Sequence, residues 1–127
     1  MGEKQCFMSD KAAVTGGPYS QAVIHNGLIY VSGQCAVDPV TNELRLGTIE
    51  EEARLSLENI RIILEEAGSG LEKVLKVTVY LLHMDDFSRF NEVYVSYFKE
   101  RRPARVCIQA GKLPFETRVE VDAIAHI

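Results

Sequence analysis

One segment near the middle of the chain is predicted to fold as a helix that packs on another layer of structure. Its apolar side chains recur every three or four residues, at Ile49, Ala53, Leu57, Ile60, Leu64 and Ala67, which is the spacing of one helix face. Thr48 and Glu51 have the spacing of a capping box, and Gly68 supplies a stop. Because such a face must be buried, the chain needs a second layer to cover it.

That second layer is predicted to be a β-sheet. Residues 22–25 and 28–33 flank Asn26-Gly27, a strong hairpin signal. Three later segments, 74–82, 104–110 and 118–127, also have strand character. In the first and last of these, alternate positions are apolar, at Leu75, Val77, Val79, Leu81 and at Val119, Val121, Ala123, Ala125, Ile127. Each predicted strand therefore presents one face to a core.

A second helix is predicted between the later strands. Asp85 or Asp86 can cap it, and Pro103 is expected to end it. Its apolar stripe is aromatic: Phe87, Phe90, Tyr94, Tyr97 and Phe98. Aromatic side chains at helical spacing are typical of core anchors rather than of a cofactor site.

These elements predict an α+β fold. Residues 1–127 are expected to form one domain, with a sheet of about five to six strands and both helices on one face. The other face would carry Tyr80, Leu82, Ile124 and several charges. It is too apolar to be bare and too polar for an internal core, so we predict an oligomer interface there.

Charge and cysteine content narrow the function classes. A net charge of −4 disfavours nucleic-acid binding by broad phosphate neutralisation, although Lys99, Arg101, Arg102 and Arg105 form one basic cluster. The three cysteines, Cys6, Cys35 and Cys107, indicate neither a disulfide framework nor a zinc knuckle. No apolar run has signal-peptide or membrane-spanning length, so a cytoplasmic, reducing location without membrane contact is expected.

Several kinds of site are disfavoured by spacing. His25, His83 and His126 are isolated in the sequence, which argues against a metal, and the glycine pairs at 16–17 and 68–70 lack the pattern of a phosphate loop. Cys107 and His126 can be written as a nucleophile and its base. The favoured interpretation of Cys107 is a small buried hydrophobe, because that is the commoner use of cysteine.

Arg105 is the main candidate for chemistry. It follows Pro103-Ala104 at the start of a predicted strand, where its planar fork could bind a carboxylate bidentately. The alternative is a surface salt bridge. Glu120 is similarly open between an exposed carboxylate and a water-orienting group, and Tyr19 between a core aromatic and a gate.

Short motifs along nearly the whole chain resemble one family. They are Gly17-Pro18-Tyr19-Ser20-Gln21-Ala22, Val31-Ser32-Gly33-Gln34, Leu57-Glu58-Asn59-Ile60, Phe90-Asn91-Glu92-Val93-Tyr94, Pro103-Ala104-Arg105, Leu113-Pro114 and Val119-Glu120-Val121-Asp122-Ala123. In this order they resemble the reactive intermediate deaminases, the RidA or YjgF family.

The resemblance implies a chorismate-mutase-like α+β fold, assembled as a homotrimer with sites between subunits. It implies hydrolysis of enamines and imines such as 2-aminoacrylate to 2-keto acids and ammonia, by a 2-iminobutanoate/2-iminopropanoate deaminase without a cofactor or metal. Arg105 would bind the substrate carboxylate, while Glu120 and the Cys107 backbone position a water. Tyr19, Ser32, Gly33 and Asn91 match further pocket positions.

The sequence departs from the family pattern at three places. Arg102 stands where an aromatic is frequent, which would add positive charge at the pocket mouth and bears on substrate preference. Glu52-Ala53 replaces a frequent Gln-Thr pair, and Gly111-Lys112 precedes Leu113-Pro114 where Ala-Arg or Ala-Ala is common. Neither of these last two changes affects the residues expected to act on the substrate.

Two other functions stay open. Family members have been labelled endoribonucleases or translation inhibitors, a role that the acidic balance of this chain disfavours. A non-catalytic metabolite-binding regulatory module would use the same Arg105 pocket, so sequence does not separate it from an enzyme.

Overall fold

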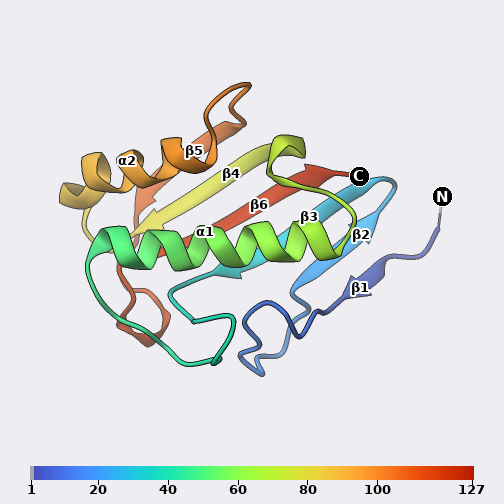
Figure 1. Ribbon diagram of the computed structural model, residues 1–127, viewed down its shortest axis with the longest axis horizontal. Helices are drawn as coiled ribbons and strands as arrows, with labels where there is room; N and C mark the ends of the chain where they lie inside the picture. Colours follow the sequence, from blue (N-terminus) through green and yellow to red (C-terminus); the bar gives the residue numbers. More distant parts are fainter. Residues whose placement is uncertain (1) are drawn as a thin grey trace.

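The computed structural model describes residues 2–127 and shows one six-stranded sheet with two long helices (Figure 1). Along the chain the strands and helices are β1 Gln5–Phe7, β2 Ala22–His25, β3 Leu28–Gln34, α1 Ile49–Glu66, β4 Val74–Leu81, α2 Phe87–Tyr97, β5 Ala104–Gln109 and β6 Val119–His126. Short 3₁₀ turns lie at Leu71–Lys73, Met84–Asp86 and Pro114–Glu116. The strand order is β1-β2-β3-β6-β4-β5, in which only β4 and β5 are parallel.

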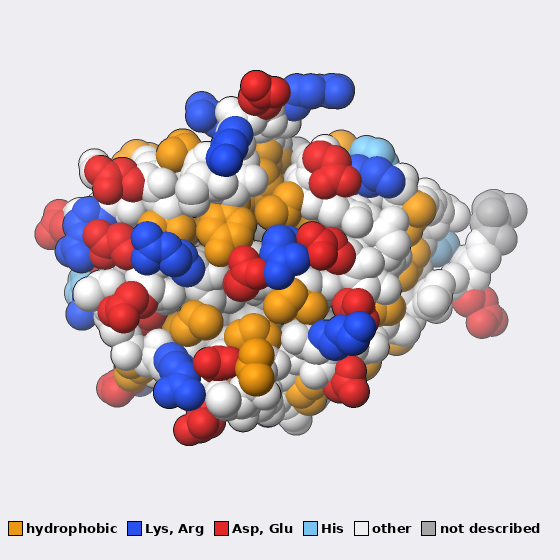
Figure 2. Space-filling model, in the orientation of Figure 1, with side chains coloured by type: hydrophobic (Ala, Val, Ile, Leu, Met, Phe, Trp, Pro, Cys, Tyr) orange, Lys and Arg blue, Asp and Glu red, His pale blue; other side chains and the backbone are white. Residues whose placement is uncertain are grey.

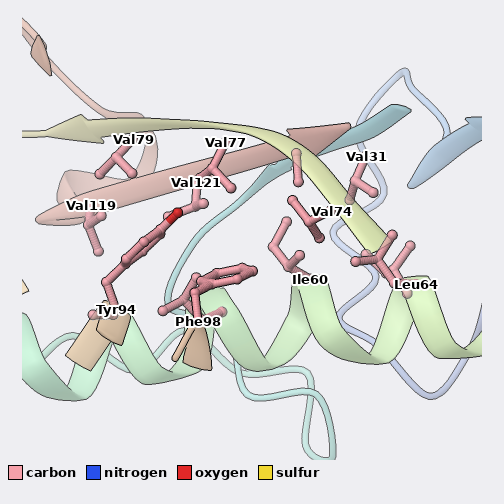
Figure 3. Close-up of a cluster of buried hydrophobic side chains, with 14 of the residues drawn as sticks. Val31, Ile60, Leu64, Val74, Val77, Val79, Tyr94, Phe98, Val119 and Val121 are labelled. Carbon is pink, nitrogen blue, oxygen red and sulfur yellow. The ribbon is translucent and has the colours of Figure 1, made fainter. Parts of the chain in front are cut away.

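Both helices lie on one side of the sheet, as predicted (Figure 1). The core between the layers combines the α1 face, with Leu57, Ile60 and Leu64, and the inward side chains of β4 and β6. Tyr94 points from α2 toward the valines of these two strands, and the ring centre of Phe98, the residue after α2, lies 4.7 Å from that of Tyr94 (Figure 3). Burial of these apolar side chains supplies most of the favourable free energy of such a fold.

The ends of α1 are as the sequence predicts. Thr48 Oγ1 accepts from Glu51 N (3.2 Å) and Thr48 N donates to Glu51 Oε1 (2.9 Å), so the capping box is complete. After Ala67, Gly68 adopts a φ of +89°. Ser69 N then donates to Leu64 O (2.7 Å), which is the hydrogen bond of a Schellman motif.

The hairpin is also confirmed, with Asn26 and Gly27 both at positive φ between β2 and β3. Strand β1 was not predicted. It has only three residues and no alternation of its own, and it forms by pairing Phe7 with Ala22 at the edge of the hairpin.

Two residues assigned to the apolar faces of strands were placed wrongly. Register shifts by one residue between Val74 and Lys76, so Leu75 is an extra residue on β4, and its side chain is exposed. Val74 takes its place in the core. Ile127 lies beyond the end of β6 and is half exposed.

The boundaries of α2 differ from the prediction in two respects. Asp86 occupies the N-cap position, but its side chain makes no capping hydrogen bond. The helix ends at Tyr97 rather than near Pro103, and Arg102 Nε donates to Phe98 O (3.0 Å) at that end. Arg102 therefore satisfies a terminal carbonyl of α2. Of the aromatic stripe, Phe90, Tyr94 and Phe98 are buried, whereas Phe87 is exposed.

The two faces of the molecule differ. Over the helix-covered face, acidic and basic side chains are interspersed (Figure 2). The opposite face of the sheet, here called the open face, is covered by neither helix, and the strand register places Tyr30, Tyr80, Val106, Ile108 and Ile124 on it. Tyr30, Val106 and Ile108 are each at least 44% exposed. Among residues 2–127, neither helix is long and apolar enough to cross a membrane.

Candidate active site

Glu120 lies on the open face where β3 and β6 lose their regular pairing. Val31 pairs with Ala123 but Gln34 pairs with Val121, so β3 carries one extra residue at Ser32-Gly33. The carboxylate of Glu120 packs against Gly33, where a Cβ would overlap Oε2 and lie 2.7 Å from Cδ. A bulge of this kind re-aims nearby side chains. Glycine at position 33 thus makes the space that Glu120 occupies.

Two hollows meet at Glu120. The outer pocket, about 330 Å³, is lined by Tyr19, Ser32, Gly33, Pro114 and Glu120. The inner cavity, about 80 Å³, is more enclosed and continues past Glu120 towards Ala13, Cys35 and Val37. The structure therefore brings four of the predicted site residues, Tyr19, Ser32, Gly33 and Glu120, to one place.

The surroundings of Glu120 favour its protonated form. Burial raises the pKa of the Glu120 carboxyl, and the negative charge of Asp122, two residues along the same face of β6, raises that pKa further. Tyr80, directly opposite Glu120 on β4, donates from its hydroxyl to Asp122 Oδ2 (3.1 Å). Asp122 is thus held in place beside Glu120.

Tyr19 is positioned by its own loop. Its hydroxyl forms a 2.6 Å hydrogen bond with Thr15 Oγ1, and its ring covers Gly17, where a Cβ would collide with the ring. Tyr19 is 51% exposed and lines both hollows, so it is not a core aromatic. Its place at the boundary between them fits the alternative, that of a gate.

Arg105 lies elsewhere, against the aromatic face of α2. Its Cζ is 4.6 Å from the ring centre of Tyr94, 5.6 Å from that of Phe87 and 6.0 Å from that of Phe90. Within residues 2–127 no carboxylate forms a salt bridge with it. The surface salt bridge considered from sequence is therefore wrong: Arg105 is half-buried, stacked by cation–π contacts and without a counter-ion.

Cys107 and Asn91 lie near Arg105. Strand β5 is an edge strand, and directly after it the N–H of Ala110 donates to Leu81 O on the parallel neighbour β4. Because alternate residues of a parallel strand direct their backbone groups to opposite sides, the N–H and C=O of Cys107 face the unpaired edge. On α2, Asn91 falls between Phe87 and Tyr94 at helical spacing, on the side that carries Arg105.

Within a single chain, Arg105 and Glu120 do not come together. Arg105 pairs with Val77, whose side chain is buried beneath the helices, whereas Glu120 pairs with Tyr80 on the open face. Arg105 and Glu120 thus belong to opposite faces of the sheet. The sequence could not show this, because the register across residues 111–117 was undetermined.

The Cys107 and His126 pair is excluded by the same register. Cys107 pairs with Val79 and faces the helices, while His126 pairs with Leu28 at the far end of the open face. Burial raises the pKa of the Cys107 thiol, and the positive charge of Arg105 lowers it only in part. Cys107 is therefore a poor thiolate nucleophile.

His25 and His126 are less isolated than the sequence suggests, since they flank Leu28 from neighbouring strands. The part of the chain that the structure describes nevertheless contains no group of three or more His, Cys, Asp or Glu residues placed to hold a metal ion.

The sequence and the fold of this chain were compared with those of known proteins. Residues 9–127 match the family model described as Endoribonuclease L-PSP. The human 2-iminobutanoate/2-iminopropanoate deaminase is 44% identical over 122 residues, which cover 96% of this chain and 89% of the human protein.

Two solved structures share the fold. A putative endoribonuclease from Thermotoga maritima has a TM-score of 0.92 at 46% identity, covering 97% of both chains. RidA from an Antarctic Psychrobacter has a TM-score of 0.92 at 41% identity, covering 97% of this chain and 99% of its own. The motif resemblance, the family match and the shared fold agree, and this chain belongs to the Endoribonuclease L-PSP family, the RidA family.

Proposed function

We propose that this protein hydrolyses 2-imino acids, formed from enamines such as 2-aminoacrylate, to 2-keto acids and ammonia. The observation that carries the proposal is the half-buried guanidinium of Arg105, which rests on three aromatic rings and pairs with no carboxylate among the described residues. A cation held in this way is suited to an anionic ligand, and its planar fork matches a carboxylate. The name of the human relative supports the same chemistry.

The charges of the substrate are complementary to Arg105 and to the acidic pair Glu120 and Asp122. A protonated 2-imino acid carries a carboxylate at one end and a positively charged nitrogen next to it. Arg105 would bind the carboxylate, and the acidic pair Glu120 and Asp122 would lie near the iminium nitrogen. A substrate bound at both ends would offset charges that no ion pair compensates among residues 2–127.

The reaction then needs a water molecule held next to the imine carbon and one group, Glu120, that accepts and returns a proton. Glu120 accepts a proton from a water as the water oxygen bonds to the imine carbon, giving a carbinolamine. Glu120 passes this proton to the amino nitrogen. The C–N bond then breaks as the hydroxyl oxygen forms the C=O bond and gives its proton to Glu120, which leaves ammonia and a 2-keto acid; the ammonia takes up that proton and restores the carboxylate. A raised pKa makes Glu120 a stronger base than an ordinary carboxylate, and the free carbonyl of Cys107 can orient the water.

The opposite placement of Arg105 and Glu120 supports sites formed between subunits. In the proposed homotrimer, the β5 edge of one subunit, with Arg105, Cys107 and Asn91, faces the outer pocket of the next. The exposed apolar side chains of the open face, Tyr30, Val106 and Ile108, would be buried by the same association.

The test uses 2-aminoacrylate produced in situ by a serine dehydratase, with pyruvate formation as the measurement. We expect wild-type protein to accelerate pyruvate formation. Arg105→Ala should lose roughly ten- to a hundredfold of that activity or more, because a charge-assisted hydrogen bond contributes about 1.5–3 kcal/mol.

Arg54→Ala is the matched control, since Arg54 is exposed on α1 and should leave the rate unchanged. Full activity of Arg105→Ala would overturn the mechanism.

The two other functions predict different outcomes. A metabolite sensor would still bind a keto acid after Glu120→Ala, and wild-type protein would not accelerate pyruvate formation. An RNA-directed role would show as RNA cleavage that co-purifies with the assembled protein and is lost in a pocket variant.

A further inference from the structure

The loop that carries Tyr19, residues 14–19, is attached to the rest of the molecule at few points. It contains Gly16, which has a φ of +75° and, as a glycine, loses more conformational freedom on ordering than other residues. Among residues 2–127, the only hydrogen bonds that link this loop to another segment are two between Val14 and Asn42. The position of Tyr19 therefore depends strongly on Asn42.

The side-chain amide of Asn42 pairs with the backbone of Val14 in both directions. Val14 N donates to Asn42 Oδ1 (2.7 Å), and Asn42 Nδ2 donates to Val14 O (2.5 Å). One side chain thus satisfies both the donor and the acceptor of a single residue, as a neighbouring strand would. This pair of hydrogen bonds, here called the Asn42 clamp, fixes the start of the loop.

Asn42 is itself held by a well-formed turn. Asn42 N donates to Asp38 O (2.8 Å), and Asp38 Oδ1 accepts from Val40 N (2.8 Å). A bridge between Val37 and Leu44 closes the turn. Asn42 has a φ of +62°, a conformation that asparagine adopts more readily than most residues. The clamp therefore joins a loop with few hydrogen bonds to a turn with several.

A short series of contacts leads from Asn42 to the candidate active site. Thr15 follows Val14, and its Oγ1 forms the 2.6 Å hydrogen bond with the hydroxyl of Tyr19. Val14, Thr15 and Tyr19 all line the inner cavity beside Glu120. Asn42 is part of the wall of neither the inner cavity nor the outer pocket. Asn42 can thus affect the site only through the loop.

We infer that Asn42 is a positioning residue, which orders residues 14–19 before the substrate binds and so holds Tyr19 against it. The inference rests on the proposed function, because it assumes that the substrate lies between Tyr19 and Glu120. A ligand that meets an ordered loop does not have to order the loop itself, and it binds more tightly for that reason.

The test removes the clamp and keeps the turn. Asn42→Gly deletes both hydrogen bonds, and glycine adopts a positive φ without strain. Asn26→Gly is the matched control. Asn26 also has a positive φ (+50°) and is exposed, but it lies in the turn between β2 and β3 and lines neither hollow. The two variants therefore change the same residue type in the same backbone conformation.

Two quantities are measured on each variant: the Kd of pyruvate, the stable product, by titration calorimetry, and kcat/KM for hydrolysis of 2-aminoacrylate generated in situ. Asn42→Gly should raise the Kd and lower kcat/KM by the same factor, about two- to tenfold, which is the range expected for a net hydrogen-bond contribution. Equal factors mean that substrate and transition state lose the same binding, so kcat stays unchanged. Asn26→Gly should change neither quantity.

A double-mutant cycle tests the route from Asn42 to Tyr19. Thr15→Val removes the hydroxyl that bonds to Tyr19 and keeps a β-branched side chain. If the clamp acts through this bond, Asn42→Gly should raise the Kd of pyruvate less in the Thr15→Val protein than in wild-type protein. Additive effects of the two substitutions would contradict this route, because a general loss of stability would not depend on Thr15.

Amide hydrogen exchange reports the order of the loop without catalysis, and residues 14–19 should exchange faster in Asn42→Gly than in Asn26→Gly. Wild-type values of Kd and kcat/KM in Asn42→Gly would overturn the inference and leave the deaminase intact. A fall in kcat/KM without weaker pyruvate binding would overturn it as well. If wild-type protein neither binds pyruvate nor accelerates its formation, the proposed function fails, whereas the exchange rates still decide whether Asn42 orders the loop.

Discussion

The surroundings of Arg105 and Glu120 suit both side chains to binding a charged ligand. Arg105 rests on Tyr94, Phe87 and Phe90 and forms no ion pair within residues 2–127, and Glu120 is half-buried beside a second carboxylate. Both arrangements cost stability in an isolated chain. A ligand that is negative at one end and positive at the other would offset both costs, which links the proposed substrate to these two residues.

The Pro103-Ala104-Arg105 motif identified Arg105 from sequence, but its aromatic partners could not be predicted. They come from α2 and reach Arg105 only because α2 crosses over to the parallel strand β5. Nothing in the local sequence reveals this contact. The missing counter-ion, which separates a ligand site from a salt bridge, is likewise visible only in three dimensions.

Asp122 provides a residue-scale prediction about pH. As a base, Glu120 must be ionised, so kcat/KM should fall as the pH drops below the pKa of Glu120. Asp122→Asn removes the neighbouring negative charge that raises this pKa. The pKa of Glu120 then falls, and the acid limb of the pH–rate profile should move to lower pH.

The groups that face Glu120 are Asp122 from its own strand, Tyr80 from β4, and Tyr19 and Cys35 from the loop side. Tyr80→Phe should shift the limb less, because it frees Asp122 without removing its charge. Glu72→Gln, an exposed change at the other end of β4, serves as the control and should leave the profile in place. An unmoved acid limb in Asp122→Asn would show that Asp122 does not tune Glu120.

The secondary-structure elements whose ends are set by residues close in sequence could be predicted. The capping box and glycine stop fixed α1, and Asn26-Gly27 fixed the hairpin, because each depends on residues close in sequence. The extra residues at Leu75 on β4 and at Ser32-Gly33 on β3 were missed, since a bulge depends on the pairing of distant strands. The second bulge makes room for Glu120, so the site depends on a feature without a local signal.

Thr48 tests the contribution of the α1 cap. Thr48→Ala leaves Glu51 N without its side-chain acceptor and should lower the free energy of unfolding by about 1 kcal/mol. Urea denaturation followed by circular dichroism measures this change, with the m-value unaltered. Thr41→Ala, in an exposed loop, is the control and should change stability by less than about 0.5 kcal/mol. Equal stability of the two variants would contradict the assigned role of the cap.

At the scale of the molecule, the residues predicted to form the site lie on two different surfaces. The β5 edge carries Arg105 and the unpaired backbone of Cys107, and the outer pocket carries Tyr19, Ser32, Gly33 and Glu120. The sheet separates Arg105 from Glu120, so one chain cannot apply both to the same small substrate. In the proposed closed ring of three chains, each β5 edge would lie against a neighbour's outer pocket.

Mixed trimers test this arrangement directly. Arg105→Ala and Glu120→Ala should each be nearly inactive alone. When the two variants are co-expressed at equal levels, random assembly makes about three quarters of the trimers mixed, and about one site in three of each mixed trimer receives an intact Arg105 and an intact Glu120 from different subunits.

Activity should therefore return to about a quarter of the wild-type value per subunit. Purification with a different affinity tag on each variant isolates the mixed species, and their mass in solution reports the number of subunits. If each site lay within one subunit, every site of a mixed trimer would lack one of the two residues and no activity would return. Recovery of activity by mixing would thus show that Arg105 and Glu120 act across a subunit boundary.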